Sequence, residues 1–500
     1  MDAGGPSPKR RRSASPGADE DGGCADYISA LPDVLLGEII SLLPTKDGAR
    51  TRILASRWRD LWLSAPLNLD CRELTAGRYE VRSDVVSRIL SSHGGPGRRL
   101  YVNTHIHRIP ADTVEACLRS TALDNLEELD FINYRSEQPQ RALIFRFSPT
   151  LRVANIGGCN LSDVNFHELN LHFPLLKLLG LLNVTISECS LHSLIAGCPA
   201  LECLLIDMCV GFRRIQINSP TIRCMAARVT QCGIPVMTDL PQLEQLVIEK
   251  APCLVRLLFH RGTVLQVSVL AAPKLETLGF VSNKYGSGEF SRFTIGSTVI
   301  LVSPVVSQLH FHVQKKKYPS PDLCIGLILL LSYLIKGLSV DTLITVVYTV
   351  KILALEMHNL SLDTVIELMR CFPCLERLYI ESVQSRPGNL WRRKHRNLMK
   401  CFDTSLKTLV LQPYQGKKSQ INFLTFFVLN AKVLESVTLG IKTRNNNEKF
   451  LAEQRTKLQL ENRVSRDAQF HFRTRCCVGS SYDIEHIRDL DLTDPFAHTS

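Results

Sequence analysis

Long hydrophobic runs are missing from this chain of 500 residues. Its most apolar stretch, residues 323–335, is followed by Lys336 and is too short to cross ~30 Å of hydrocarbon, which takes about 20 residues. We interpret it as a buried helix or strand. The amino-terminal segment 1–25 is rich in Gly, Pro, Ser and charge and holds no apolar core of a secretory signal. These absences predict a soluble intracellular protein with no membrane contact.

Charge of one sign is also only weakly in excess. Lys and Arg number 59 against 48 Asp and Glu, which gives a formal net charge of +11. Proteins that bind nucleic acid usually concentrate a stronger positive bias on one face. The cationic run at residues 392–396 is interpreted as a solvated loop, with a contact to nucleic acid or to an acidic partner as the alternative. Nucleic acid is therefore not an expected partner.

Motifs for catalysis or metal binding are missing as well. The 17 cysteines are scattered, and the one Cys-x-x-Cys, Cys371 with Cys374, has no second pair to complete a zinc site. The segment at residues 416–419 resembles the end of a phosphate loop, but Leu411 stands where such a loop requires glycine, so a turn is predicted. We expect no catalytic residue, no cofactor and no metal ion.

The segment 1–25 offers little to bury and is predicted to be disordered. It contains one compact basic run, formed by Lys9, Arg10, Arg11 and Arg12. Such a run is typical of a nuclear import signal, and a solubilising tail is the alternative. We expect the protein in the nucleus, the cytoplasm or both.

Residues 26–66 change character, because apolar residues recur there at helical spacing. Pro32 suits the first turn of one helix, Pro44 ends it, and Asp47 is placed to cap a second helix. A unit of about 40 residues cannot bury enough surface to be stable alone. Its apolar side must therefore pack against the rest of the chain or against a partner.

Leu31-Pro32-Asp33, Leu42-Leu43-Pro44 and Ser56-Arg57-Trp58 stand in the order and spacing of a plant-type F-box, which this segment resembles. The resemblance implies docking onto a Skp-family adaptor and, through it, onto a cullin ubiquitin ligase. The residues predicted to form the apolar surface facing the adaptor are Leu31, Pro32, Leu35, Ile39, Leu43, Pro44, Leu54, Trp58 and Trp62.

A second pattern, Pro-x-Leu-x-x-Leu-x-apolar, recurs from about residue 120. Its copies include those that begin at Pro174, Pro199, Pro241, Pro252, Pro273 and Pro373. The last two apolar positions lie two residues apart and so share one face of a short strand, as in a leucine-rich repeat. The step from Pro241 to Pro252 is too short for a full repeat of about 20–29 residues, so some repeats are predicted to lack helices. Residues 281–300 and 312–322 are predicted to be loops.

Residues 405–441 resemble the FBD module that follows such repeats in plant F-box proteins, through Leu406-Lys407, Phe426-Phe427 and Leu434-Glu435. Their pattern predicts a strand, a turn, an apolar helix and a strand, a repeat-like unit placed to cover the last open edge of the solenoid.

The predicted fold class is α/β: a small helical F-box, then an irregular leucine-rich-repeat solenoid with a parallel sheet, then an FBD-like cap. The predicted boundaries are a tail at 1–25, the F-box at 26–66, a linker and first strands at 67–120, repeats at 121–385, the FBD-like cap at 386–480 and a tail at 481–500.

The resemblances together imply a non-catalytic substrate-recognition subunit of an SCF-type ubiquitin ligase, which binds a target protein through its repeats. The alternative is a nuclear interaction scaffold that does not mediate degradation and keeps the apolar face of the F-box buried within the chain. The identity of the target does not follow from the sequence.

Overall fold

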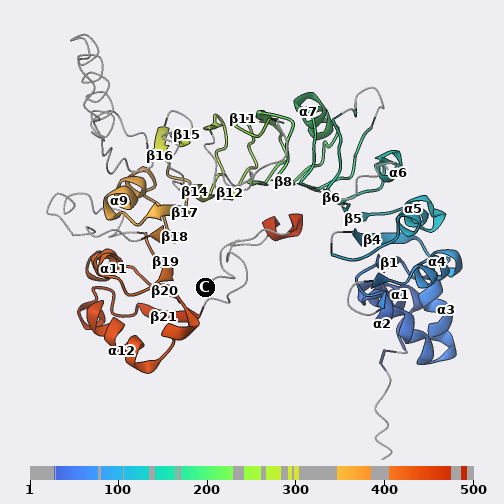
Figure 1. The fold of residues 1–500 in the computed structure, drawn as a ribbon, viewed down its shortest axis with the longest axis horizontal. Helices are drawn as coiled ribbons and strands as arrows, with labels where there is room; N and C mark the ends of the chain where they lie inside the picture. Colours follow the sequence, from blue (N-terminus) through green and yellow to red (C-terminus); the bar gives the residue numbers. More distant parts are fainter. Residues whose placement is uncertain are drawn as a thin grey trace, which may run out of the picture.

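A long parallel sheet, curved into an arc, organises the computed structural model of this chain (Figure 1). The structure describes residues 27, 28, 30–76, 80–104, 106–133, 141–162, 164, 166, 171–228, 241–260, 266–282, 291–295, 298–302, 346–384, 405–474 and 486–491. Within these residues the sheet has 14 strands, each parallel to its neighbours. Its strands, in spatial order, are β1 (Leu67–Asp70), β4 (Gly97–Asn103), β5 (Glu128–Ile132), β6 (Val153–Gly157), β7 (Leu178–Leu182), β8 (Cys203–Asp207), β10 (Cys224–Arg228), β12 (Arg256–His260), β14 (Thr277–Ser282), β17 (Ile352–Asn359), β18 (Arg377–Gln384), β19 (Thr408–Tyr414), β20 (Ser436–Ile441) and β21 (Gln469–Thr474).

Helices lie along the outer side of the arc (Figure 1). At the amino-terminal end are α1 (Asp33–Leu42), α2 (Thr45–Arg50), η1 (Thr51–Ile53) and α3 (Ser56–Ser64). The outer helices that follow are α4 (Ser83–Ser92), α5 (Ala111–Arg119), η2 (Thr121–Leu123), α6 (Arg141–Phe145), α7 (Glu188–Ala196), α9 (Leu362–Cys371), α11 (Lys418–Asn430), η4 (Thr443–Asn445), α12 (Glu448–Lys457) and η5 (Leu460–Asn462). A short antiparallel pair, β2 (Thr75–Ala76) and β3 (Glu80–Val81), precedes α4.

One row of apolar side chains runs across the sheet in register and forms the centre of the core. It passes from Leu100 through Leu129, Ala154, Leu179, Leu204, Met225, Leu257, Leu278, Leu353, Leu378 and Leu409 to Val437. Every member is buried. Each repeat therefore supplies one leucine or a substitute of similar character to a shared core, as the sequence pattern predicts.

A second sheet replaces the outer helices in the middle of the arc. It contains β9 (Arg214–Asn218), β11 (Gln245–Lys250), β13 (Gln266–Val269), β15 (Ser291–Ile295) and β16 (Thr298–Val302). The prediction that some repeats lack helices is confirmed here, and the short step from Pro241 to Pro252 is a half repeat that joins an outer strand to an inner one.

Two sequence predictions in this region are wrong. The copy led by Pro241 forms β11 of the outer sheet and not an inner strand, because its alternating apolar residues suit either sheet. The predicted loop at 281–300 contains β15 and the first residues of β16, and these two strands pair in antiparallel fashion. The expected loop at 312–322, the apolar stretch at 323–335, the cationic run at 392–396 and the tail at 1–25 lie outside the described residues.

The FBD-like unit continues the main sheet. β19, α11 and β20 follow in the predicted order, and the predicted turn between strand and helix contains Gly416 at φ +70°, a conformation that glycine adopts without strain. A Cβ at this position would also lie 2.8 Å from Oε1 of Gln454. The edge strand at the carboxy-terminal end of the sheet is β21, so residues 405–441 are an interior part of the solenoid and this edge lies one strand further on.

Part of the predicted carboxy-terminal tail at 481–500 is docked on the sheet. Residues Ile487–Asp491 form the short helix η6, which lies inside the arc and contacts β7, β8 and β10 (Figure 1). Ile487 and Leu490 are fully buried there.

We expect Leu204→Ala to lower the free energy of unfolding by about 2–5 kcal/mol, because it removes a fully buried side chain from the central row. The matched control is Leu270→Ala, which truncates a side chain that is 57% exposed and should change stability by no more than about 0.5 kcal/mol. Urea unfolding followed by circular dichroism measures both. Equal effects would contradict the assignment of the row as the core.

Candidate protein-binding surface on the N-terminal helices

Prolines precede the first two amino-terminal helices. Pro32 is the N-cap of α1, and Asp33 in the first turn complements the positive end of the helix dipole. Pro44 is the N-cap of α2, so Asp47 lies inside that helix and pairs with Arg50 at 3.0 Å; the prediction that Asp47 caps the helix is wrong. The predicted second helix is also divided, because Ala55 is extended between η1 and α3.

One side of these helices packs against the chain itself. Leu36 and Ile40 of α1 and Trp58, Leu61 and Trp62 of α3 are buried. The Trp62 ring meets His93 edge-on at a centroid distance of 5.0 Å. Gly48 lies close to the same tryptophan, since a Cβ there would be 3.2 Å from the indole Nε1.

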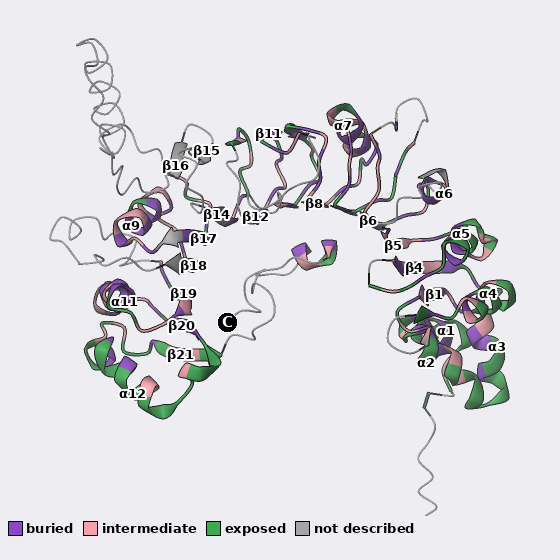
Figure 2. Cartoon of the chain, viewed as in Figure 1, coloured by how far each residue is buried: buried purple, intermediate pink, exposed green. Residues whose placement is uncertain are grey.

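The opposite side exposes many large apolar side chains, and exposed residues mark these helices in Figure 2. We call it the N-terminal apolar surface, and its exposed members are Tyr27, Ile28, Val34, Leu35, Ile39, Leu42, Ile53 and Leu54. Leu42 is 79% exposed, Ile53 84% and Leu54 65%. Most of the exposed large apolar side chains of the described residues belong to this surface. A concentration of large exposed apolar side chains on one segment is typical of a protein-binding site.

The residues predicted for this surface divide into two groups. Leu35, Ile39, Leu54, Pro32 and Pro44 are exposed, and Leu31 and Leu43 are partly exposed. Trp58 and Trp62 are only 7% and 6% exposed, so the expectation that their side chains lie on the exposed surface is corrected: they anchor the helices to the chain's own core.

Val34, Leu42 and Ile53 belong to the N-terminal apolar surface but are absent from the predicted set. The composition of α1 nevertheless indicates that this helix has more apolar side chains than its buried side needs. Six of its ten residues, DVLLGEIISL, are large and aliphatic, more than one buried face requires. A helix that is apolar on more than one side is covered on more than one side in its working state. The surplus therefore points to a partner that covers the outer side of α1.

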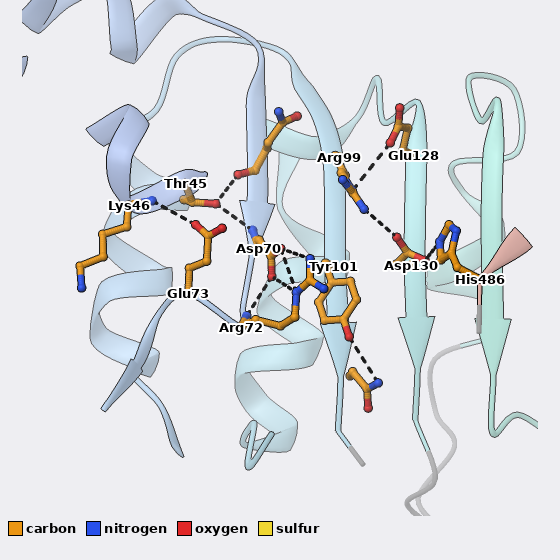
Figure 3. A network of polar contacts seen from close by, with 12 residues as sticks. Thr45, Lys46, Asp70, Arg72, Glu73, Arg99, Tyr101, Glu128, Asp130 and His486 are labelled. Atoms are coloured by element: carbon orange, nitrogen blue, oxygen red, sulfur yellow. Dashed lines mark hydrogen bonds and ion pairs between the residues drawn. The ribbon is translucent and has the colours of Figure 1, made fainter. Parts of the chain in front are cut away.

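Hydrogen bonds fix the helices to the first strands of the sheet (Figure 3). Thr45 Oγ1 donates to the carbonyl of Asn68 at 2.5 Å and accepts from the Asp70 amide at 3.0 Å. Arg98 of β4 reaches α1, where its Nη1 lies 2.9 Å from Glu38 Oε2 and 2.8 Å from Ser41 Oγ. The N-terminal apolar surface is thus held in a fixed orientation relative to the repeats.

A polar network continues from these contacts along the inner face of the sheet (Figure 3). Asp70 accepts hydrogen bonds from the Arg72 guanidinium, which raise the pKa of Arg72, and that guanidinium stacks 4.0 Å from the ring centre of Tyr101. Further on, burial opposes ionisation of Asp130, but the hydrogen bond with His486 and the charge of Arg99 outweigh it and hold the pKa of Asp130 below its ordinary value. The inner face of the sheet therefore carries the carboxylates of Asp70 and Asp130 on β1 and β5, near the amino-terminal helices.

The part of the chain that the structure describes includes no group of three or more His, Cys, Asp or Glu placed to hold a metal ion. Among the helices it describes, none has the length and apolar character required to cross a bilayer.

Comparison with known families assigns the chain as a whole. The model of the FBD-associated F-box protein At5g56370 leucine-rich repeats matches residues 114–312 and 328–380, about half of the chain. The F-box domain matches residues 28–70, and the FBD matches residues 394–439. The chain therefore belongs to the family of F-box proteins with leucine-rich repeats and an FBD.

Individual relatives come from Arabidopsis thaliana. The F-box/FBD/LRR-repeat protein At5g56420 is 30% identical over 239 residues, which cover 45% of this chain and 55% of that protein. The putative F-box protein At1g21990 is 26% identical over 494 residues, 89% of this chain and 98% of that protein. For several others, such as the F-box/LRR-repeat protein At5g02910, the chain spans only about half of their length or less.

We expect the stability of the amino-terminal helices to fall as pH drops from 7 to 5. Burial beside Trp62 lowers the pKa of His93 below its ordinary value, so below about pH 6.5 the unfolded chain takes up a proton that the folded chain does not. The contribution of His93 is therefore complete above this pH and is lost as the pH falls.

Urea unfolding followed by tryptophan fluorescence at pH 7, 6 and 5 measures this dependence. His93→Asn keeps an acceptor near the Gly95 amide, which now donates to His93 Nδ1 at 3.2 Å, but removes the titrating ring. The variant should show a smaller loss of stability on acidification. An unchanged loss would assign the pH dependence to other groups.

Proposed function

We propose that this protein is the substrate-recognition subunit of an SCF-type ubiquitin ligase. Its F-box binds a Skp-family adaptor, the adaptor links it to a cullin scaffold, and its repeats bind a target protein for ubiquitination and degradation. The protein itself forms no covalent bond. Its contribution is to hold the target close to the ubiquitin-conjugating enzyme in a suitable orientation.

The observation that carries this proposal is the N-terminal apolar surface. It lies on the segment that matches the F-box domain, and it exposes Val34, Leu42 and Ile53 on the side that the chain's own core does not cover. An adaptor with an apolar groove would remove these side chains from water, at roughly 25 cal/mol per Å² of apolar area. The same exposure speaks against a scaffold that keeps this face buried within the chain.

Rigid attachment of the helices supports the same role. The contacts of Thr45 with β1 and of Arg98 with α1 leave little freedom between the F-box and the first repeats. A receptor that presents a target at a fixed distance needs this stiffness, because effective concentration falls when a linkage is loose.

We expect Leu54→Asp to weaken adaptor binding by about 30-fold or more, because it places a charge in the apolar interface that the proposal assigns to it. The matched control is Leu270→Asp, which introduces the same charge at another exposed leucine, on the outer sheet side of the arc. Co-purification and titration with a Skp-family adaptor measure both variants. Neither substitution removes a buried side chain, so both chains should remain folded.

Adaptor binding that is equal for wild type, Leu54→Asp and Leu270→Asp would contradict the assignment of the surface. Failure of the wild-type chain to bind any Skp-family adaptor would contradict the proposed function itself. The nuclear scaffold that does not mediate degradation would then be the better interpretation.

For localisation, we propose that the basic run Lys9-Arg10-Arg11-Arg12 directs the protein to the nucleus. The run lies outside the described residues. Replacing its four residues by alanine should lower the nuclear-to-cytoplasmic ratio of a fluorescent fusion, since an import receptor reads the cationic side chains. The control replaces Arg392, Arg393, Lys394 and Arg396, an equal number of positive charges elsewhere in the chain. A ratio that falls equally in both variants, or in neither, would contradict this assignment.

A further inference from the structure

A segment from the carboxy-terminal end lies on the inner face of the sheet. Its helix η6 (Ile487–Asp491) contacts β7, β8 and β10, strands that are far away from it in sequence. Figure 1 shows this short helix inside the arc. In Figure 2 the same short helix carries both buried and exposed residues. It occupies the concave side of the repeats, opposite the outer helices.

Two aliphatic side chains dock this segment. Ile487 and Leu490 are fully buried in a cluster with Leu205, Ala226 and Leu258 of the inner face. These three residues and Gly180 follow one another in register on adjacent strands. Gly180 lies directly beneath Ile487, since a Cβ there would meet the Cβ of Ile487 at 3.4 Å, an ordinary contact distance. The same Cβ would clash with the side chain of the neighbouring Asn155, so glycine leaves room for that side chain next to the docked segment.

Charged groups flank the apolar contact on both sides. At one end, Nε2 of His486 lies 2.6 Å from Oδ1 of Asp130 (Figure 3), and the Arg488 guanidinium lies 2.5 Å from Glu128 Oε2. At the other end, the Arg256 guanidinium donates to the carbonyl oxygen of Leu490 at 2.9 Å. The surface thus offers carboxylates to the basic residues of the segment and a guanidinium donor to the carbonyl group at its other end.

The segment also organises its own turn. The His486 amide donates to Asp489 Oδ2 at 2.9 Å, and the Asp489 amide donates to the His486 carbonyl at 3.0 Å. His486 Nδ1 accepts from the Arg488 amide at 3.1 Å, so the neutral ring carries its proton on Nε2, toward Asp130. A turn that is ordered by its own hydrogen bonds loses less entropy on binding than a disordered peptide.

We infer that the inner face over β5 to β12 is a peptide-binding surface, that residues 486–491 occupy it as an intramolecular ligand, and that a partner protein displaces them with a peptide of the same pattern. The pattern is a histidine or basic residue, an aliphatic residue, arginine, a turn-capping residue such as aspartate, and an aliphatic residue. The identification of this partner with the ubiquitination target rests on the proposed function. The competition between a partner peptide and residues 486–491 for the inner face does not depend on it.

The modest size of the docked segment makes displacement feasible. It is held by one short turn, two aliphatic side chains, the hydrogen bond from His486 to Asp130 and the ion pair of Arg488 with Glu128. The ion pair is partly exposed to solvent and screened by salt. A tethered ligand nevertheless competes at an effective concentration that reaches about 1 mM. A partner peptide therefore binds more weakly to the closed chain than to an opened one, in proportion to the opened fraction.

The test uses the full chain and a fluorescent peptide of residues 484–493, followed by anisotropy. Ile487→Asp together with Leu490→Asp should open the surface, and this chain should bind the peptide at least about tenfold more tightly than wild type. A peptide that carries the same two aspartates is the control and should not bind. An opened chain that melts like wild type but does not bind the peptide, or binds it no more tightly than wild type does, overturns the inference.

Charge reversal locates the binding site. In the opened chain, Glu128→Arg should weaken peptide binding at least about tenfold, and a peptide with Arg488→Glu should restore it. The matched control is Glu276→Arg, because Glu276 also pairs with a cation, Lys351 at 3.0 Å, but none of the described contacts of η6 involves it. Equal losses for both reversals would overturn the placement on the inner face. Adaptor binding takes no part in either experiment, so these outcomes are independent of the proposed ligase role.

Discussion

The stacking of one apolar side chain per strand is the interaction on which the rest of the structure depends. Leu179 lies against Ala154 and Leu204 in the ladder, and each further repeat adds the next member of the row. Each strand is stabilised mainly by its two neighbours, so the sheet tolerates irregular outer elements as long as the row continues. Replacement of helices by the outer sheet between α7 and α9 leaves the row uninterrupted.

The same row explains how much of the fold could be predicted from the sequence. A strand that buries two residues on one side needs apolar residues two apart, and proline before it favours extended backbone, so most inner strands are predictable. β10 fits the same spacing with Ile222, Met225 and Ala227 in place of leucines. The pattern places β11 in the wrong sheet because a strand of the outer sheet buries the same alternation. Only the number of residues between successive strands distinguishes an outer strand from an inner one. The short step from Pro241 to Pro252 indicates that one of these two copies belongs to the outer sheet.

In the F-box, periodicity identifies the apolar residues but not what covers them. Trp58 and Trp62 are buried by their own chain because Pro66 and β1 follow α3 directly and bring the first repeat against it. Leu54 precedes α3, is not covered by the first repeat and remains exposed. Large aromatic residues are strong anchors in any interface, so their identity alone could not decide between an internal and an external partner. The surplus of aliphatic residues on α1 carries the better signal, since a helix buried on one side does not need it.

The docking of residues 486–491 has no periodic signal at all. The segment is short and half charged, and its composition resembles a solvated tail; its partners Glu128, Asp130 and Arg256 are far away in sequence. Complementarity between such distant residues becomes visible only when the solenoid sets the strands side by side. Because the inner face is continuous, a site built there draws on many repeats at once, each contributing one or two side chains. A segment with two aliphatic anchors and matched charges is sufficient to occupy such a site, and it is small enough to be replaced by a partner that offers the same contacts.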